Sequence, residues 1–260
     1  MKILKNILIT GASSGIGAAL ADHYAHSGII LHINGRNAER LEQVASHCRQ
    51  KGAEVYTSLV DVTDQEKMAE WVIAAGQKSP IDLVIANAGI SGGTGGRVDG
   101  EPIHEARKIF NVNVHGVFNT VEPALSVMKG QKNGGQIAII SSLAGFRGWP
   151  SSPAYSASKG AVRFYGEALR GALKHTNIKI NVVCPGFVTS RMTDSNDFPM
   201  PFKMEADRAA KIIATGLEKN KGRICFPWPM HFITWFIGTW PDAFAQKILT
   251  KAPSKKALTD

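Results

Sequence analysis

A glycine-rich turn near the beginning of the chain constrains the fold more than any other feature. The apolar run from Asn6 to Thr10 predicts a strand, residues 11–17 read GASSGIG, and a helical pattern follows from Ala18 to Ser27. In such a unit of strand, turn and helix, glycines let the backbone approach a pyrophosphate, which then lies at the helix N-terminus. The spacing TGxxxGxG differs from the commoner GxGxxG, so a plain strand-to-helix connection is the alternative.

Strands and helices alternate along most of the remaining chain. Apolar runs predict further strands at 29–33, 55–60, 81–86, 136–140, 178–184 and 223–226, with helical patterns between them. Such alternation builds a parallel sheet whose faces are both covered by helices. We therefore expect a three-layer α/β/α fold with a doubly wound parallel sheet of about seven strands. This catalytic domain would span residues 1–226, and residues 227–260 would form an apolar, aromatic extension packed on it.

Composition and charge exclude several classes of protein. The 260 residues are 44% hydrophobic and 20% charged, which is typical of a globular protein. Three cysteines without metal-ligand spacing indicate neither a disulfide framework nor a zinc site, so we expect no metal. The net charge of +9 comes from scattered lysines and arginines, so we expect no nucleic-acid binding. The N-terminal segment lacks the features of a signal peptide, which favours a cytoplasmic location.

The ends of the second and third strands bear on the choice of cofactor. An acidic residue after the second strand would hold the adenosine ribose 2′-hydroxyl of NAD, whereas a basic one accommodates a 2′-phosphate. The chain has Arg36 there, in the sequence Asn34-Gly35-Arg36-Asn37, and no Asp or Glu. We therefore expect NADP(H), with NAD(H) as the alternative if Arg36 only caps a loop. Asp61 either accepts a hydrogen bond from the adenine amino group or shapes a turn.

Polar side chains beyond the fifth strand predict a catalytic site. Ser142 stands at the carboxyl end of that strand, where open parallel sheets bind ligands. Tyr155 and Lys159 are four residues apart on a helix, so the Lys159 ammonium can stabilise a Tyr155 phenolate and tune a general acid/base. The pair alone also occurs by chance on exposed helix faces. Asn113 lies in a long helical pattern, where it either joins a hydrogen-bond network or faces solvent.

Two segments near the C-terminal end are irregular or unusually apolar. Residues 187–204 are rich in Thr, Ser, Asn, Asp and Pro, which suggests a lid over the substrate. Residues 226–241 are aromatic but too short and too proline-interrupted to span a bilayer. They line a hydrophobic pocket, form a subunit interface or lie on a membrane surface as a peripheral contact. In the last case basic side chains nearby would help, namely Lys247, Lys251, Lys255 and Lys256.

Taken together, the motifs resemble the short-chain dehydrogenase/reductase family over roughly residues 5–226. The matching motifs, in the family's order and spacing, are TGASSGIG at 10–17, Asn87-Ala88-Gly89, Asn113, Ser142, Tyr155, Lys159 and Pro185-Gly186. The resemblance implies that Tyr155 protonates the substrate carbonyl oxygen and that Ser142 orients this oxygen. It also implies that Lys159 lowers the pKa of Tyr155 and binds the nicotinamide ribose, and that Asn113 holds a proton-relaying water.

The same resemblance implies a set of cofactor contacts. They are Gly11, Ser13, Ser14, Gly15, Ile16, Gly17, Arg36, Asn37, Asp61, Val62, Asn87, Ala88, Gly89, Tyr155, Lys159, Pro185, Gly186, Val188 and Thr189. Some NADP-dependent members carry a basic residue inside the glycine turn, where this chain has Ser14. Family members are usually dimers or tetramers built on the helices that carry Asn113 and Tyr155, so a homodimer or homotetramer is expected.

These observations lead to one principal function and two alternatives. The principal hypothesis is an NADPH-dependent oxidoreductase that reduces an apolar ketone or aldehyde. The nearer alternative is an NAD-linked alcohol or hydroxysteroid dehydrogenase. A non-enzymatic alternative is an NADP-binding sensor or a peripheral membrane interaction protein that keeps the fold. Degenerate members of such folds typically lose the tyrosine or the lysine, and this chain retains both.

Overall fold

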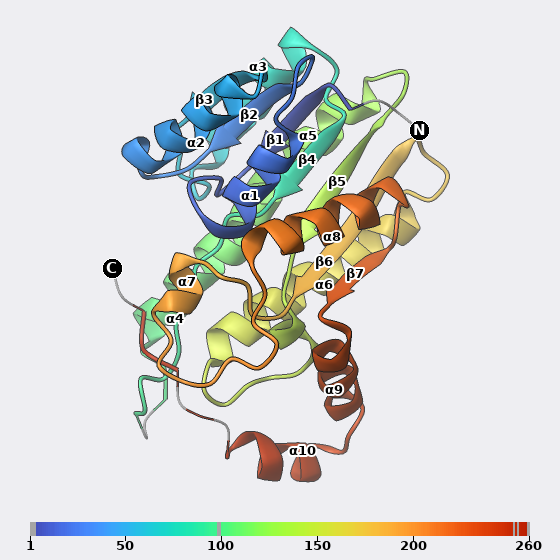
Figure 1. Ribbon diagram of the computed structural model, residues 1–260. Helices are drawn as coiled ribbons and strands as arrows, with labels where there is room; N and C mark the ends of the chain where they lie inside the picture. The colour runs from blue at the N-terminus through green and yellow to red at the C-terminus, as the bar shows by residue number, and fades with distance from the viewer. Residues whose placement is uncertain (1–3, 98–99, 252, 254, 259–260) are drawn as a thin grey trace.

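A single parallel sheet organises the molecule. The structure, a computed structural model, describes residues 4–97, 100–251, 253 and 255–258. Within these residues seven strands lie in the order β3-β2-β1-β4-β5-β6-β7 (Figure 1). The strands are β1 Asn6–Ile9, β2 Ile30–Asn34, β3 Glu54–Ser58, β4 Leu83–Ala86, β5 Gly135–Ile140, β6 Ile178–Pro185 and β7 Arg223–Phe226. Because β1 pairs with both β2 and β4, the strand order reverses beside β1, and ligands bind at such a switch point.

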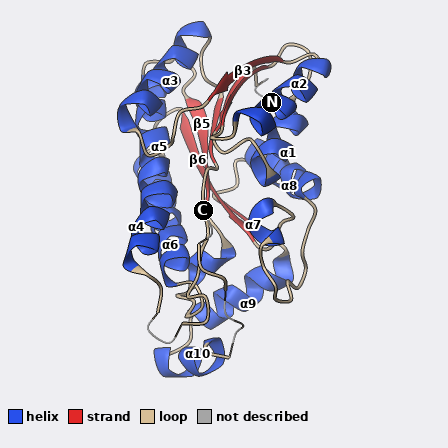
Figure 2. Ribbon diagram, turned by 90° about the vertical axis from the view of Figure 1, so that its left-hand side faces the viewer, coloured by secondary structure: helices blue, strands red, loops and turns tan. Residues whose placement is uncertain are grey.

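Helices cover both faces of the sheet (Figure 2). One layer contains α1 Gly15–Tyr24, α2 Ala38–Gln50 and α8 Ala206–Glu218, and the other contains α3 Gln65–Lys78, α4 Ile103–Phe110, α5 Gly116–Lys129 and α6 Pro153–Ala172. Successive side chains of a strand point to opposite faces. Ile7 and Ile9 of β1 therefore pack in one core, whereas Leu8 packs in the other. Two covered faces explain why the strands are continuous apolar runs in the sequence.

The observed elements confirm the predicted three-layer fold, and the strand ends lie within two residues of those predicted. The long helical pattern around Asn113 is interrupted, however. A π-helical turn, η1 Asn111–His115, separates α4 from α5. Single π-turns of this kind are frequent at functional sites, since they reorient a side chain within a helix.

The segment after β6 is mostly irregular, as predicted for a lid. It contains one short helix, α7 Arg191–Asp194, which a capping box of Ser190 and Thr193 begins. An isolated bridge between Val188 and Met204 brings the two ends of the segment together. The segment therefore forms a loop that leaves the carboxyl end of the sheet and whose two ends lie side by side.

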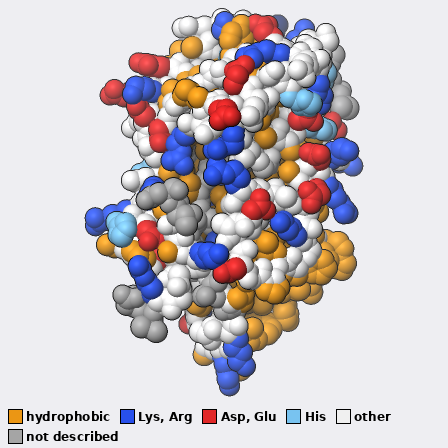
Figure 3. All heavy atoms as spheres, turned by 60° about the vertical axis from the view of Figure 1, so that its left-hand side comes forward, with side chains coloured by type: hydrophobic (Ala, Val, Ile, Leu, Met, Phe, Trp, Pro, Cys, Tyr) orange, Lys and Arg blue, Asp and Glu red, His pale blue; other side chains and the backbone are white. Residues whose placement is uncertain are grey.

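Two helices follow the last strand, α9 Trp228–Gly238 and α10 Asp242–Leu249. Met230 of α9 packs against a cluster around Leu143 in the short helix η2 Leu143–Phe146, which follows Ser142. The outer surface of both helices exposes large apolar side chains, namely Trp228, Phe232, Ile233, Trp235, Phe236, Phe244 and Ile248. Figure 3 shows a hydrophobic patch at this lower end of the molecule. Among the described residues no helix combines the length and the apolarity that crossing a bilayer requires.

Candidate active site

The glycine turn is tied to the end of β4 by hydrogen bonds. The Asn87 side-chain Nδ2 donates to the carbonyl oxygens of Thr10 and Gly11, at 2.9 and 3.1 Å. The backbone N–H groups of Asn87 and Ala88 both donate to the Thr10 hydroxyl, at 3.0 and 3.1 Å. Asn87 and Ala88, which the sequence assigns to cofactor binding, thus also fix the turn beside the switch point.

The turn has the shape of a cradle that larger side chains would fill. Gly11 and Gly15 have φ angles of 65° and 56°, in the left-handed region that favours glycine. A Cβ at Gly17 would lie 2.4 Å from the carbonyl oxygen of Gly11. Ser14 is the N-cap of α1 and makes no side-chain cap hydrogen bond, so the first N–H groups of the helix face outward. This geometry fits a pyrophosphate at the helix N-terminus.

Arg36, the basic residue predicted to favour NADP(H) over NAD(H), is exposed at the end of β2. Asn37 caps α2 by accepting a hydrogen bond from the Arg40 backbone N–H at 2.9 Å, and the adjacent Arg36 side chain is exposed to solvent. Arg40, in the first turn of α2, has a buried Nε without a hydrogen-bond partner among the described residues. Arg36 and Arg40 thus both lie close to the carboxyl end of β2 in the sequence. Sequence reasoning missed Arg40, although it follows Arg36 by about one helical turn.

Asp61 and Val62 lie at the end of the third strand segment. The Asp61 Oδ1 accepts hydrogen bonds from the backbone N–H and the hydroxyl of Thr63, at 2.9 and 2.8 Å, so this carboxylate shapes a turn. Val62 is buried, and its carbonyl oxygen accepts a hydrogen bond from Asn119. An adenine contact by Asp61 remains a prediction beside this observed structural role.

The segment after β6 closes on the glycine turn. The Gly186 N–H donates to Phe226 at 2.7 Å, and the Thr189 N–H donates to Met204 at 2.8 Å. A Cβ at Gly15 would lie 2.8 Å from the Cβ of Ser190. Pro185, Gly186, Val188 and Thr189 therefore lie along the same edge as the glycine turn.

Ser142, Tyr155 and Lys159 lie near the carboxyl ends of β5 and β6. The Tyr155 and Ser142 side chains are hydrogen-bonded, and Ser142 Oγ also donates to the carbonyl oxygen of Pro185 at 3.4 Å. The buried Lys159 Nζ donates to the carbonyl oxygen of Ile140 at 3.0 Å. Tyr155 and Lys159 both lie on α6, and at the start of this helix the Ala154 backbone N–H donates to the Glu101 carboxylate at 2.8 Å. The structure thus brings the phenol and the Ser142 hydroxyl together, and the Lys159 ammonium follows one helical turn along α6, bonded to the end of β5.

The electrostatics of this site differ from the expectation that Lys159 lowers the pKa of Tyr155. Burial raises the pKa of Tyr155, and the hydrogen bond with Ser142 opposes this only in part. Burial also lowers the pKa of Lys159 to about 8. The Lys159 ammonium donates to the Ile140 carbonyl oxygen, and the raised pKa of Tyr155 favours the protonated phenol.

Asn113 is fully buried in η1 and links three segments. Its Oδ1 accepts from the Ile90 N–H at 2.8 Å, and its Nδ2 donates to the Ile90 carbonyl and to the Ser158 hydroxyl, both at 3.0 Å. The amide therefore belongs to a network, as one of the two sequence interpretations states. Both Nδ2 hydrogens are used, so a relay water would meet only the second lone pair of Oδ1. A Cβ at Gly89 would lie 3.1 Å from this Oδ1 and 3.2 Å from Lys159 Nζ.

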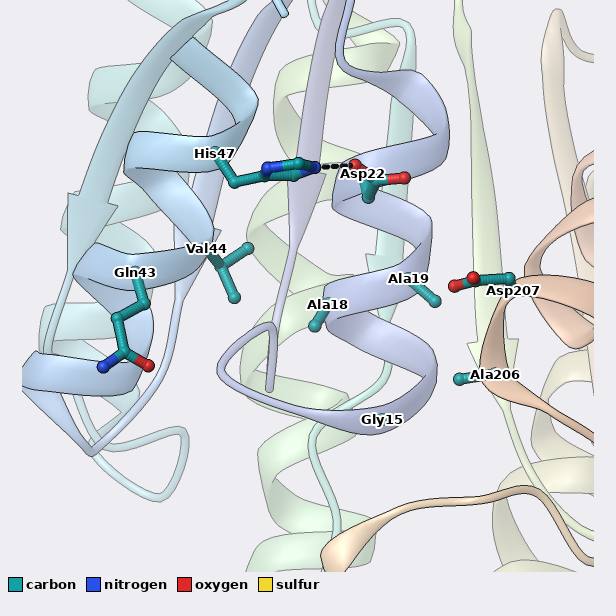
Figure 4. A pocket seen from close by; sticks show the side chains of 9 residues that line it. All are labelled: Gly15, Ala18, Ala19, Asp22, Gln43, Val44, His47, Ala206 and Asp207. Carbon is teal, nitrogen blue, oxygen red and sulfur yellow. Dashed lines mark ion pairs between the residues drawn. The ribbon is translucent and has the colours of Figure 1, made fainter. Parts of the chain in front are cut away.

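A separate hollow lies between α1, α2 and α8 (Figure 4). It has a volume of about 400 Å³ and is lined by Gly15, Ala18, Ala19, Asp22, Gln43, Val44, His47, Ala206 and Asp207. His47 of α2 and Asp22 of α1 are joined at one end of it, with Nε2 and Oδ1 2.8 Å apart. It shares only Gly15 with the predicted site, and no residue of the Tyr155 cluster lines it. We therefore place the candidate chemistry at Tyr155 and not in this hollow.

Comparison of the sequence with known proteins is consistent with the geometry. The profile of the family described as short chain dehydrogenase matches residues 5–199. An uncharacterized oxidoreductase of Myxococcus xanthus is 35% identical over 249 residues, which cover 94% of this chain and 97% of the relative. An uncharacterized oxidoreductase of Mycobacterium tuberculosis is 31% identical over 241 residues, which cover 90% of this chain and 94% of the relative.

Solved structures are also similar. A short-chain type dehydrogenase/reductase from Mycobacterium marinum superposes with a TM-score of 0.76 at 26% identity, covering 85% of this chain and 93% of that chain. A short chain dehydrogenase/reductase from Burkholderia phymatum, solved in complex with NAD, gives a TM-score of 0.82 at 24% identity, covering 99% of this chain and 98% of that chain. The second likeness shows the shared fold.

Proposed function

The chain belongs to the short-chain dehydrogenase/reductase family, and on that basis we propose that this oxidoreductase uses NADPH to reduce an apolar ketone or aldehyde. The observation that supports the proposal is the Tyr155 phenol beside the Ser142 hydroxyl at the carboxyl end of β5, where the Lys159 ammonium is bonded to Ile140. A bound nicotinamide supplies the hydride. The protein supplies position, proton transfer and electrostatics.

The side chains have distinct roles in this reaction. Tyr155 donates its phenolic proton to the carbonyl oxygen, because its raised pKa keeps the phenol protonated at neutral pH. Ser142 holds that oxygen through its hydroxyl, which already faces Tyr155. Lys159 supplies positive charge beneath the site and a donor for the nicotinamide ribose. Asn113 fixes the Ile90 backbone and the Ser158 hydroxyl against η1, so that the lysine and the glycine turn keep their positions.

The chain's own residues fit the cofactor at three places. The glycine turn and the free N-terminus of α1 would hold the pyrophosphate, and Arg36 with Arg40 would hold a 2′-phosphate. The residues from Pro185 to Thr189 would cover the nicotinamide end. The remaining cofactor contacts implied by the resemblance stay predictions.

Replacement of Arg36 by Ala tests the cofactor proposal. We expect the dissociation constant of NADPH to rise by about 10- to 100-fold, since a hydrogen bond to a charged group contributes about 1.5–3 kcal/mol. The dissociation constant of NADH should change by less than about twofold. Calorimetric titration of both nucleotides measures the ratio. Arg49→Ala, on the following helix α2, is the control, because Arg49 pairs with Glu42 on the exposed surface. An unchanged NADPH-to-NADH ratio in Arg36→Ala would refute the proposal.

The alternative of an NAD-linked alcohol or hydroxysteroid dehydrogenase is favoured by the NAD bound in the Burkholderia phymatum structure. A screen that follows nicotinamide absorbance separates the two. The purified protein is given ketones and aldehydes with NADPH or NADH, and alcohols and hydroxysteroids with the oxidised cofactors. Turnover of apolar carbonyl compounds with NADPH supports our proposal, and turnover restricted to alcohols with NAD supports the alternative.

We propose that the protein forms a homo-oligomer through α5 and α6. Phe164 of α6 is 63% exposed, and the Phe118 and Tyr165 rings, 4.9 Å apart, border a hollow of about 660 Å³ between the two helices. Exposed aromatic side chains beside a hollow are typical of an interface core. Phe164→Glu should weaken self-association by about tenfold or more in light scattering across protein concentration. Ile73→Glu on α3 is the control, and equal dimerisation by both variants would exclude this face.

The 227–260 extension differs from the catalytic domain in the aromatic surface that α9 and α10 expose. Lys247 and Lys251 accompany this surface, whereas Lys255 does not. Peripheral membrane contact therefore remains a prediction that rests on fewer basic side chains than the sequence suggested. Flotation with anionic vesicles tests it.

A further inference from the structure

The end of the described chain returns to the active site. Residues 255–258 run beside α4 and below α7 (Figure 1). The Gly95 N–H donates to the Lys255 carbonyl oxygen, and the Leu258 N–H donates to Glu105 Oε2 of α4, both at 2.8 Å. The Lys256 ammonium lies 3.4 Å from Asp197 Oδ2, just after α7. The segment is therefore held from both sides of the site.

The glycine-rich loop after β4 is shaped to receive this segment. A Cβ at Gly93 would lie 2.4 Å from the Ser151 carbonyl oxygen and 2.6 Å from the Lys255 Cβ. A Cβ at Gly92 would lie 3.1 Å from Leu258, and one at Gly95 would lie 3.3 Å from Ala257. The missing side chains thus create the space that residues 255–258 occupy.

The Lys255 side chain extends from this segment to the catalytic tyrosine. Its Nζ lies 4.7 Å from the centre of the Tyr155 ring and donates a hydrogen bond to the Ser91 hydroxyl. Within the described residues no carboxylate forms an ion pair with it. Burial lowers the pKa of Lys255 to about 8, and the charge of nearby Glu101 opposes this shift, so the side chain is still charged at neutral pH.

A half-buried ammonium with one hydroxyl partner is incompletely compensated. Removing a charged group from water costs several kcal/mol unless an opposite charge accompanies it. The Glu101 carboxylate attracts the ammonium from beyond ion-pair distance: its Oε2 accepts from the Ala154 N–H, and its buried Oε1 has no hydrogen-bond partner among the described residues. The face of the Tyr155 ring supplies only a weak attraction. An anionic group delivered by a ligand would complete the site, and the ligand that reaches Tyr155 is the substrate.

We infer that Lys255 is a substrate-binding residue whose ammonium, beside the Tyr155 ring and the Ser91 hydroxyl, pairs with a carboxylate on the carbonyl substrate. The inference rests on the proposed reduction and narrows it to keto acids and aldehyde acids with an apolar body. The carbonyl oxygen lies at Tyr155 and Ser142, and the carboxylate lies at Lys255. Lys255 is thus a specificity residue and takes no part in proton or hydride transfer.

Matched substrates separate recognition of charge from support of the fold. The full-length enzyme is assayed with para- and meta-formylbenzoate and with the methyl esters of both. Lys255→Met should lower kcat/KM for the formylbenzoates by about tenfold or more, mainly through KM, and change the esters by less than about threefold. Lys255→Arg should restore most of the preference for the acids. Lys251→Met, an exposed lysine in the same part of the chain, should behave as wild type. Equal losses with acids and esters would overturn the inference.

Binding without turnover makes the result independent of catalysis. Calorimetric titration of the enzyme saturated with oxidised cofactor should show benzoate binding about tenfold more tightly than benzamide, and Lys255→Met should remove the difference. Equal binding of benzoate and benzamide by wild type and Lys255→Met overturns the anion site and leaves carbonyl reduction standing. Lys255-dependent benzoate binding, in a protein that reduces no carbonyl compound, supports the anion site and contradicts the proposed function.

Discussion

Replacing Tyr155 by Phe should lower kcat for carbonyl reduction by about a thousandfold and leave NADPH affinity within about twofold of wild type. The phenol is the group positioned to protonate the carbonyl oxygen, and Phe keeps its ring while removing the proton. The ring also retains its place beside Lys255, so the pocket shape is preserved. Single-turnover reduction under saturating NADPH measures the chemical step, and calorimetric titration measures cofactor binding.

The pH dependence follows from the same side chain. Because burial raises the pKa of Tyr155, the phenol needed for reduction is present throughout the neutral range. Alcohol oxidation needs the deprotonated form, so its rate should rise with pH above neutrality, by up to about tenfold per unit.

For the Tyr155→Phe substitution the control is Tyr56→Phe, which removes an exposed hydroxyl on β3 far from the site. Retention of wild-type reduction by Tyr155→Phe would remove Tyr155 from the mechanism.

Replacing Gly17 by Ala should weaken NADPH binding by about a hundredfold and lower the free energy of unfolding by about 2–3 kcal/mol. The new Cβ would lie 2.4 Å from the Gly11 carbonyl oxygen and 2.5 Å from Asn87 Nδ2. Neither atom can withdraw alone, since the two are hydrogen-bonded to each other. The turn must therefore separate from β4, and the cradle for the pyrophosphate opens.

Denaturant unfolding and nucleotide titration measure the two effects of Gly17→Ala separately. Gly171→Ala is the matched control, because nothing lies within 4 Å of its added Cβ near the end of α6. It should stabilise the protein by up to about 1 kcal/mol, as alanine favours the helix over glycine. NADPH affinity equal to wild type in Gly17→Ala would show that the turn does not hold the pyrophosphate.

The layers of the fold follow from local patterns in the sequence. Strands buried on both faces must be continuously apolar, and the alternation of strands with helices leaves little choice but a parallel sheet. Gly11 and Gly17 likewise predict a phosphate-binding turn, because only glycine, which has no side chain, tolerates the backbone geometry of such a turn. The meeting of Ser142 with Tyr155 was also predictable, because both follow the carboxyl end of one strand.

Other features of the site depend on contacts between distant parts of the chain. The network of Asn113 with Ile90 and Ser158 requires the π-turn, which no periodicity indicates. The direction of the Tyr155 pKa shift depends on how deeply the phenol is buried, and spacing to Lys159 says nothing of that. The sequence groups Lys255 with three other lysines as a membrane contact. Its true position depends on the return of the chain across 164 residues to Ser91.

The segment 255–258 contributes nothing to either hydrophobic core of the sheet, yet it supplies a side chain that faces the reacting group. Recognition and folding are therefore encoded in separate stretches of the chain. Substitutions in these four residues can change which compounds are accepted without producing an unstable protein. A similar change in β5 or α6 would disturb the core. With this arrangement, relatives that share the scaffold can diverge in substrate range with little loss of stability.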